Sequence, residues 1–401
     1  MSKGFWTLRY TLLNVTYFVA FCTIHALAAV FLLDKGFTNT EVGILLAIAN
    51  ILSAVAQPVV AGIIDKPGPL TNRRFILISV IVIAIGSLLL MVCSDKKALV
   101  FIIYVIIYMI QFTYQPVMTA LCFEYQKAGC NIYYGLARGL GSASFAVTSA
   151  FVGGAVEKSG VGILLIVNVA AMLISAIIIF TFKMSNNNLS VKEYTDTEAT
   201  DVSTESPDIH NNLFDFIRAY PSFSLFLLGT ICFYFAHNMI NDFMIQIIRS
   251  LGGGEKELGY SNFLQAILEL PVMALIGFVL KKITSSKLLI MSGFAFFIKI
   301  LILVFATNMG GMYLSQSFQL FAYAVFIPAA AYYVSNNISE SDQVKGQAFV
   351  TSAITIGGVF SNLISGVILD NLGIKPMLIT GTIIAAVGAI IVFVAFGKRK
   401  I

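Results

Sequence analysis

Apolar runs of about 19 to 26 residues recur along almost the whole chain, and this feature limits its fold more than any other. Each run is long enough for an α-helix to cross the roughly 30 Å hydrocarbon core of a bilayer. Only 11% of the residues are charged, whereas a soluble domain has about 25%. The runs are too long, and alternate too little between apolar and polar residues, for strands of a membrane barrel. The sequence therefore predicts an all-α polytopic membrane protein.

Twelve such runs can be delimited, and we predict one transmembrane helix for each. They lie at 10–32, 40–64, 75–93, 98–122, 133–156, 161–182, 222–248, 257–280, 287–307, 311–335, 346–369 and 375–397. No cleavable signal peptide is expected, because the first run is too long for the apolar part of one and a second span follows closely.

Lysine and arginine are more frequent in the loops and tails on the side of the N-terminus than in those on the other side. By the positive-inside rule, both termini are expected in the cytoplasm, with the chain in the cell (inner, cytoplasmic) membrane. The net charge of +5 follows from this topology, so no nucleic-acid partner is expected.

The cysteines are odd in number, irregularly spaced and mostly inside the predicted spans. They are Cys22, Cys93, Cys122, Cys130 and Cys232. We expect small apolar side chains here rather than a disulfide framework or a metal site. No cofactor is expected either.

The longest polar segment, 184–221, is rich in Ser, Thr, Asn and acidic residues, and it predicts a flexible cytoplasmic linker. It separates an N-terminal six-helix bundle, 1–183, from a C-terminal six-helix bundle, 222–401. Two loop patterns support a duplication, because each recurs in the second half at nearly the same offset. Gly36-x4-Glu41-Val42-Gly43 recurs as Gly252-x4-Glu257-Leu258-Gly259, and Gly153-x3-Glu157-x2-Gly160 recurs as Gly366-x3-Asp370-x2-Gly373.

After the second span the chain has the stretch "AGIIDKPGPLTNRR". It resembles the loop motif of the major facilitator superfamily, Gly-x3-Asp-Arg/Lys-x-Gly-x-Arg-Arg/Lys. Ala61 stands where the motif has its first glycine, and about three residues are inserted before the basic pair. The resemblance implies a gating role, in which an acid at a helix end pairs with loop cations and a neighbouring helix. The residues concerned are Asp65, Lys66, Gly68, Arg73 and Arg74, and an ordinary positively charged loop is the alternative.

Within the superfamily, the stretch "YYGLARGLGSASFA" is similar to one in the lactose permease-like group of oligosaccharide and nucleoside proton symporters. The resemblance implies two six-helix pseudo-repeats with the substrate between them, and it places Arg138 at the group's sugar-binding arginine. "LQAILELPV" resembles a Glu-x-Pro pattern of the same group, which puts Glu269 about one turn from a substrate-binding glutamate. Pro271 also removes the backbone donor to the carbonyl of Ile267, beside this acid.

The chain departs from the permease in the span at 311–335. Gln316, Gln319 and Ala322 stand where the permease has ionisable residues, so galactoside specificity is not expected. Lys299 stands where the permease has an arginine.

An ionisable side chain in mid-bilayer costs at least about 2.5–3.5 kcal/mol and usually marks a pathway, an ion pair or a site. Arg138 and Glu269 lie in opposite halves, and together they suit a solute with hydroxyls or with both donor and acceptor edges. Lys299 and Asp242 are further candidates. A structural ion pair or a polar tie between helices is the alternative for each, and it is the favoured interpretation for Glu124, His25 and His237.

Uncharged polar residues extend the predicted site. In the fourth span, Tyr108, Gln111 and Gln115 share one helical face, and Gln316, Gln319 and Tyr323 repeat this spacing in the tenth span. The two stripes predict a polar central cavity, and a hydrogen-bonded seam between helices is the alternative. Further binding candidates are Tyr17, Asn50, Asn238 and Gln265.

Glu269 is the predicted proton-coupling residue, because a carboxyl that alternates between cavity water and a cationic neighbour can load and release a proton. Either Lys299 or Arg138 can be that neighbour, and Asp242 with His237 is the second choice. A sodium site is not expected, since the carboxylates are scattered.

The sequence thus predicts a secondary transporter that works by alternating access as a monomer, with proton-coupled uptake of a sugar, oligosaccharide or nucleoside. A drug or sugar efflux antiporter is the alternative within the same architecture, and the 33 phenylalanines favour it. A membrane receptor or sensor that does not transport is the alternative of another class. An enzyme is not expected, because no nucleophile–base set or metal cluster can be assembled.

Overall fold

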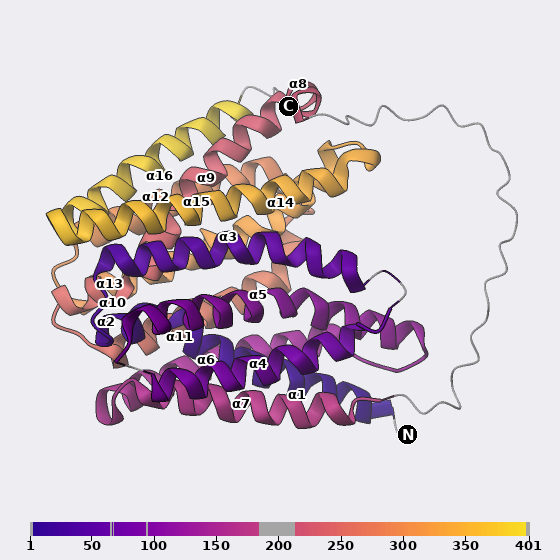
Figure 1. The fold of residues 1–401 in the computed structure, drawn as a ribbon. Helices are drawn as coiled ribbons and strands as arrows, with labels where there is room; N and C mark the ends of the chain where they lie inside the picture. Colours follow the sequence, from indigo (N-terminus) through magenta and orange to yellow (C-terminus); the bar gives the residue numbers. More distant parts are fainter. Residues whose placement is uncertain (1–2, 65, 67, 94, 184–212, 398–401) are drawn as a thin grey trace, which may run out of the picture.

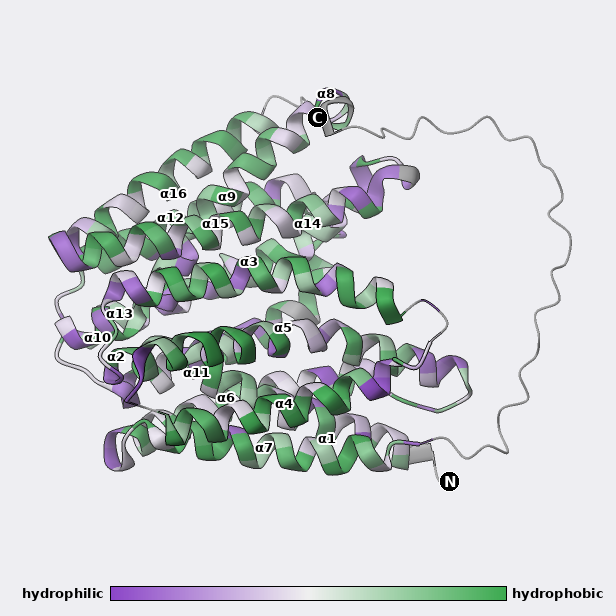
Figure 2. Ribbon diagram, in the orientation of Figure 1, coloured by the Kyte–Doolittle hydropathy of each residue, from purple (hydrophilic) through white to green (hydrophobic). Residues whose placement is uncertain are grey.

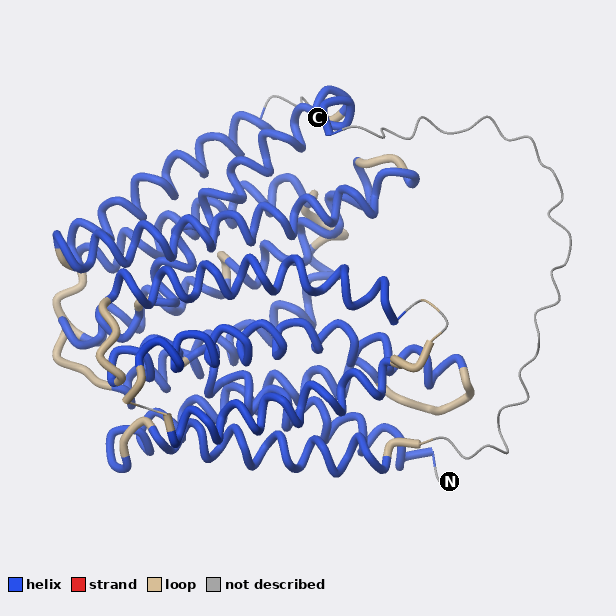
Figure 3. The backbone as a smooth tube through the Cα atoms, viewed as in Figure 1, coloured by secondary structure: helices blue, strands red, loops and turns tan. Residues whose placement is uncertain are grey.

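The structure is a computed structural model that describes residues 3–64, 66, 68–93, 95–183 and 213–397. Those residues form helices joined by short loops and contain no strand (Figure 3). Hydrophobic residues run along most of the helices, whereas hydrophilic residues are concentrated toward their ends and in the loops (Figure 2). The predicted all-α membrane fold is confirmed.

The helices before the linker follow the predicted first six spans closely. They are α1 (Lys3–Phe21), η1 (Cys22–Ala26), α2 (Ala28–Asp34), α3 (Asn39–Ile64), α4 (Asn72–Val92), α5 (Lys97–Lys127), α6 (Tyr134–Ser159) and α7 (Gly162–Thr181). Helix η1 is a π-helix, and α1 with η1 meets α2 at an angle of 51°.

The helices after the linker follow the predicted last six spans in the same way. They are α8 (Leu213–Ala219), α9 (Pro221–Asp242), α10 (Met244–Ser250), α11 (Glu255–Val279), α12 (Ser285–Phe305), α13 (Met309–Ser317), η3 (Phe318–Leu320), α14 (Tyr323–Asn337), η4 (Glu340–Asp342), α15 (Gln343–Leu372) and α16 (Ile374–Gly397). Most of the predicted linker, at 184–212, lies outside the described residues.

Among the described helices, ten are long and apolar enough to cross a membrane singly, and the bent α1–α2 pair makes an eleventh. Helix α11 is not among these, but its 25 residues span about 37 Å. It lies in the bundle alongside α6 (Figure 1). We therefore count it as the twelfth crossing.

The predicted spans at 10–32, 222–248 and 311–335 are each broken, although the sequence predicts continuous helices. The first break is at Leu27, with φ −113° and ψ 19°, and the second is at Phe243, with φ −114° and ψ 22°. These residues are neither glycine nor proline, so composition gives no signal for either break. They have nearly the same backbone conformation and occupy equivalent places in the two halves.

The loop glycines repeat in the same way, and they confirm that the two six-helix units are pseudo-repeats. Each has a positive φ, a conformation that glycine adopts without a steric penalty. The pairs are Gly36 (77°) with Gly252 (83°), and Gly160 (78°) with Gly373 (87°).

The two halves meet mainly through α3 against α15 and α6 against α11. Glycines allow backbones to touch at these crossings, as is common between membrane helices. A Cβ atom on Gly43 would clash with the carbonyl of Asn362, and one on Gly153 would clash with the carbonyl of Glu255.

These contacts lie at one end of the bundle, which we call the far end. It holds the loops at 35–38 and 251–254, whereas the opposite, terminal end holds the first residue of α1 and the last of α16 (Figure 1). Two carboxylates cross between the halves at the far end. Asp370 accepts hydrogen bonds from the backbone amides of Asn39 (3.1 Å) and Thr40 (2.7 Å), and Glu157 accepts one from the amide of Lys256 (3.0 Å).

The same helices separate toward the terminal end. Gly135 lies about five helical turns from Gly153, and Gly277 about five turns from Gly259, so each pair shares a helix face. A Cβ atom on Gly153 or Gly259 would clash with the other half, yet one on Gly135 or Gly277 would have no atom within 4 Å. The interface between α6 and α11 is therefore closed at the far end and open at the terminal end.

Candidate functional site

A chain of three side chains forms the polar centre of the C-terminal half. The Lys299 ammonium donates to Oε1 of Gln319 (2.8 Å), and Nε2 of Gln319 donates to Oε1 of Glu269 (3.0 Å). Lys299 is only 1% exposed and Gln319 only 2%. One amide thus links a buried cation to a carboxylate, with its acceptor toward the cation and its donor toward the anion.

Gln319 takes this position because the tenth span is not one helix. Helix α13 ends at Ser317, a short 3-10 turn follows, and α14 begins at Tyr323. Two hydroxyls tie this broken span to α12. Ser292 of α12 donates to the carbonyl of Ala322 (2.8 Å), which also accepts from the Phe326 amide (3.0 Å), and Ser315 of α13 donates to the carbonyl of Lys299 (2.6 Å).

Arg138 projects from α6 and lies 4.4 Å above the ring of Phe18. Its Nη1 donates to the hydroxyl of Ser142 (2.7 Å). No acidic side chain among the described residues lies within salt-bridge distance of it. Arg138 lies on α6 and Glu269 on α11, and these two helices pack against each other across the halves. The two predicted charged side chains are thus on neighbouring helices of opposite halves.

An aromatic cluster lines the N-terminal half beside this arginine. The ring of His25, in the π-helix η1, stacks on Phe21 (4.0 Å between centroids, 12° between planes). It also contacts Tyr108 (3.9 Å) and Phe112 (4.6 Å). π-Helical turns are often found at functional sites. This cluster was not predicted from the sequence, although Phe18, Phe21 and His25 follow helical spacing.

The histidine of the C-terminal half has a similar aromatic neighbour. His237 stacks on Tyr323 (5.2 Å, 15°), and its Nε2 accepts a hydrogen bond from Nδ2 of Asn241 (2.8 Å). Asn238 packs against Gly358 of α15. Asp242 is the last residue of α9. No described contact joins Asp242 to His237, which were predicted to act together.

The remaining predicted residues are more enclosed. The Tyr17 hydroxyl donates to the Gln111 carbonyl (3.2 Å), and the Tyr108 hydroxyl donates to Oδ1 of Asn50 (3.3 Å). Gln111 and Gln316 are fully buried. Gln265 is buried one turn before Glu269, and Gln115 is half-buried one turn after Gln111. Parts of both predicted polar stripes therefore lie inside the bundles.

The predicted gating motif has contacts within its own half. Arg73 donates to the carbonyls of Ile179 and Phe180 (both 3.0 Å) at the end of α7, and the Ile179 carbonyl also accepts from the amide of Phe182 (3.2 Å). Nη1 of Arg74 donates to the carbonyl of Pro69. Lys66 and Gly68 lie in an exposed bend, and Asp65 lies outside the described residues. The gating role of this loop remains a prediction.

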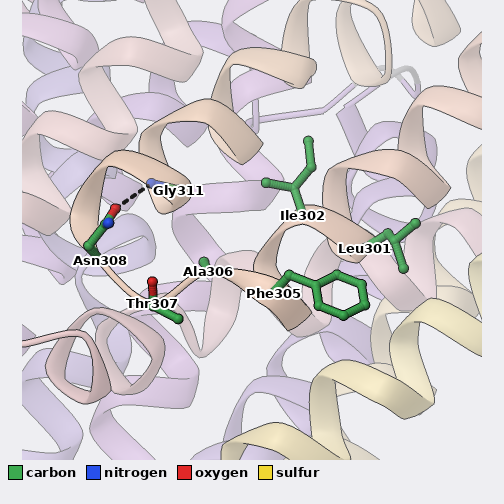
Figure 4. Close-up of a pocket in the computed structure, with 7 residues that line it drawn as sticks. All are labelled: Leu301, Ile302, Phe305, Ala306, Thr307, Asn308 and Gly311. Atoms are coloured by element: carbon green, nitrogen blue, oxygen red, sulfur yellow. Dashed lines mark hydrogen bonds between the residues drawn. The ribbon is translucent and has the colours of Figure 1, made fainter.

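An open surface depression of about 510 Å³ lies near the loop between α12 and α13 (Figure 4). It contains none of the predicted site residues. Its lining is Leu301, Ile302, Phe305, Ala306, Thr307, Asn308 and Gly311, with the Asn308 side chain accepting a hydrogen bond from the Gly311 amide (3.0 Å). It therefore plays no part in the candidate site.

The five cysteines are free thiols. Within the described ranges, no group of three or more His, Cys, Asp or Glu side chains is placed to hold a metal ion.

The fold and its central charges define a membrane protein with the architecture of the major facilitator superfamily. A model of the MFS_1-like family matches residues 10–379, and the chain belongs to this family.

Solved structures support the same architecture. The nucleoside transporter NupG aligns with a TM-score of 0.77 and 14% identity over 100% of both chains. A single-residue variant of NupG aligns with a TM-score of 0.79 and 13% identity over 98% of this chain and 100% of that one. A bacterial homolog of the human lysosomal transporter Spinster, inward-facing and unoccupied, aligns at 0.67 and 14% over 100% and 98%. No curated protein sequence matches the chain.

Proposed function

We propose that this chain is a secondary transporter that takes up a small polar solute by alternating access, coupled to protons. The single observation that carries the proposal is the chain from Lys299 through Gln319 to Glu269 on α11, the helix that packs against the Arg138 helix, α6, of the other half. Buried charges of this kind in a membrane protein usually mark a transport pathway. A site between two pseudo-repeats is where such transporters bind their solutes.

A nucleoside is the first substrate class to test, with sugars and oligosaccharides next. The walls offer a carboxylate and amides for hydroxyl groups, and aromatic rings on which a flat base can stack. Phe21, His25 and Phe112 supply these rings. NupG, which has the same fold, is a nucleoside transporter, and this supports the choice.

Glu269 is the proposed coupling residue. Its carboxylate accepts a hydrogen bond from the Gln319 amide, which connects it to Lys299. Protonation of Glu269 would remove the negative charge at this end of the chain and weaken its attraction for the cations Lys299 and Arg138. The two bundles, 1–183 and 222–401, would then move as units joined by the linker at 184–221, in a monomer with cytoplasmic termini.

The test is uptake of labelled uridine, and then of a panel of sugars, into proteoliposomes with and without an imposed pH gradient. Glu269→Gln should abolish gradient-driven accumulation, because this amide cannot carry the proton, while exchange of solute without a gradient continues. Glu41→Gln, at the far end, is the matched control and should accumulate normally. Full gradient-driven accumulation by Glu269→Gln would refute the assignment of coupling.

The Phe-rich wall also favours the second candidate, a drug or sugar efflux antiporter. In the same vesicles, binding of lipophilic cations and export against a proton gradient, without nucleoside or sugar exchange, would favour it over uptake.

A further inference from the structure

The ring of Phe18 lies between Arg138 and Gly141 in the packing of α1 against α6. The Arg138 guanidinium is 4.4 Å from the ring centroid. Gly141, three residues after Arg138 on the same helix, lies against the edge of the ring. A Cβ atom on Gly141 would lie 2.6 Å from Cδ2 of Phe18 and 3.2 Å from Cβ of Asn14. Only glycine at 141 therefore leaves room for the ring where it is.

From this geometry we infer that Phe18 and Gly141 are positioning residues for Arg138, and that they set how strongly the transporter binds its solute. The ring is 8% exposed and also packs edge-on against Tyr17 at 5.0 Å, so it is itself fixed. A fixed aromatic face can hold a guanidinium over it by cation–π attraction.

This arrangement differs in one useful way from an ion pair. A carboxylate partner would occupy the planar fork of the guanidinium and cancel its charge. The guanidinium carbon lies over the Phe18 ring, which has no carboxylate to occupy the fork, and Ser142 takes one donor through Nη1, so most of the N–H groups stay available to a solute. The arginine is oriented without being neutralised.

The inference rests on the proposed function, because it takes Arg138 to contact the solute. Phe18→Leu removes the ring face and should raise KM for uridine exchange by about 2- to 30-fold, with kcat little changed. Phe18→Tyr keeps the face and should restore KM. Gly141→Ala should resemble Phe18→Leu, because it displaces the ring.

Phe31→Leu is the matched control, since it removes a ring of equal size that is 1% exposed in the same predicted span and stacks on Tyr104 instead. It should leave KM unchanged, even if it lowers the melting temperature.

A second measurement separates this inference from the proposed function. The rate at which phenylglyoxal modifies Arg138, followed by mass spectrometry without solute, should rise in Phe18→Leu and in Gly141→Ala but not in Phe18→Tyr. If Arg138→Gln bound uridine normally, the proposed site would fail, while this rate would still report on the positioning. An unchanged modification rate in Phe18→Leu, or an equal rise in KM for Phe18→Tyr, would overturn the inference.

Discussion

Gln319 links the buried ammonium of Lys299 to the half-buried carboxylate of Glu269, and these two groups do not bond each other directly. Its amide accepts from Lys299 and donates to Glu269, whereas a direct salt bridge between these two is absent among the described residues. An amide cannot titrate near neutral pH, so the link passes on electrostatic changes at Glu269 without exchanging protons itself. This role depends on the polarity of the amide rather than on charge at position 319.

Replacing Gln319 tests that role. Gln319→Leu should lower gradient-driven accumulation at least about tenfold, because it leaves two charged groups each without a hydrogen bond that contributes about 1.5–3 kcal/mol. Uptake and exchange in proteoliposomes measure the effect, and thermal unfolding measures the loss of stability.

The control is Asn168→Leu, which removes an equally buried amide that bonds Ser87, Ala20 and Thr23 inside the N-terminal half. It should lower the melting temperature but leave accumulation unchanged in the protein that remains folded. Equal loss of accumulation in both variants would mean that Gln319 contributes only to stability.

At this scale the sequence identifies charges but not their partners. Arg138, Glu269 and Lys299 stand out because ionisable side chains are rare in apolar spans. The link through Gln319 could not be predicted, because it depends on the break between α13 and α14. Nothing in the sequence marks Phe18 among the 33 phenylalanines as a residue of the site. Only the structure distinguishes it, because its ring lies beneath Arg138.

At the scale of elements, the first amides of α3 and α11 are capped by acids from the opposite half. Asp370 of α15 caps α3, and Glu157 of α6 caps α11. The two acids occupy equivalent places in the pseudo-repeats. Each neutralises helix N-terminal donors that would otherwise be unpaired. Both contacts must break if the halves separate at the far end, so the caps favour the arrangement in which that end is closed.

The double variant Asp370→Asn with Glu157→Gln should therefore shift the protein toward an open far end. The amide replacements keep an acceptor oxygen but remove the negative charge at each helix N-terminus, and this charge contributes about 0.3–1 kcal/mol at an exposed site. Together they should change the population ratio of the two states by roughly 3- to 30-fold. The measurement is the distance distribution between spin labels placed on the two far-end loops.

Glu41→Gln is the matched control for this pair. Its carboxylate is also at the far end, but it bonds the Thr38 amide and Lys97 within one half. If it shifted the distances as much as the double variant, a general loss of surface charge would explain the effect instead of the caps.

The sequence shows these acids as a repeated loop pattern, yet it does not show what they bind. Glu157 and Asp370 recur with the flanking glycines because two equivalent helix ends need the same group. The amides that they cap belong to the opposite half and lie far away in the chain. Local patterning carries no information on such distant contacts.

At the scale of the molecule, twelve spans, their order and the duplication are predictable, because hydrophobic length and repeat offset are properties of the chain alone. The conformational state is not predictable in this way. Helices α3 and α15 also separate toward the terminal end, as α6 and α11 do. Ala61 lies about five turns from Gly43 on α3, and Ala348 lies about five turns from Gly366 on α15. Both alanines are exposed, whereas both glycines contact the other half. Both pairs are therefore closed at the far end and separated toward the terminal end.

Alternating access requires the opposite arrangement as well, and the small residues indicate where it forms. Gly135 and Gly277 lie on the faces of α6 and α11 that touch at Gly153 and Gly259, about 27 Å along each helix. We expect them to approach when the far end opens, because small residues permit the same close backbone contact there.

Spin labels at 135 and 277 should give a shorter distance in the Asp370→Asn, Glu157→Gln double variant than in the native chain. Spin labels at 153 and 259 would prevent the contact between the halves at the far end. A second pair of labels is therefore placed on the two far-end loops, and the distance between these labels should lengthen in the double variant. If both pairs lengthened together, the halves would separate rather than rock, and alternating access about a central site would not describe this protein.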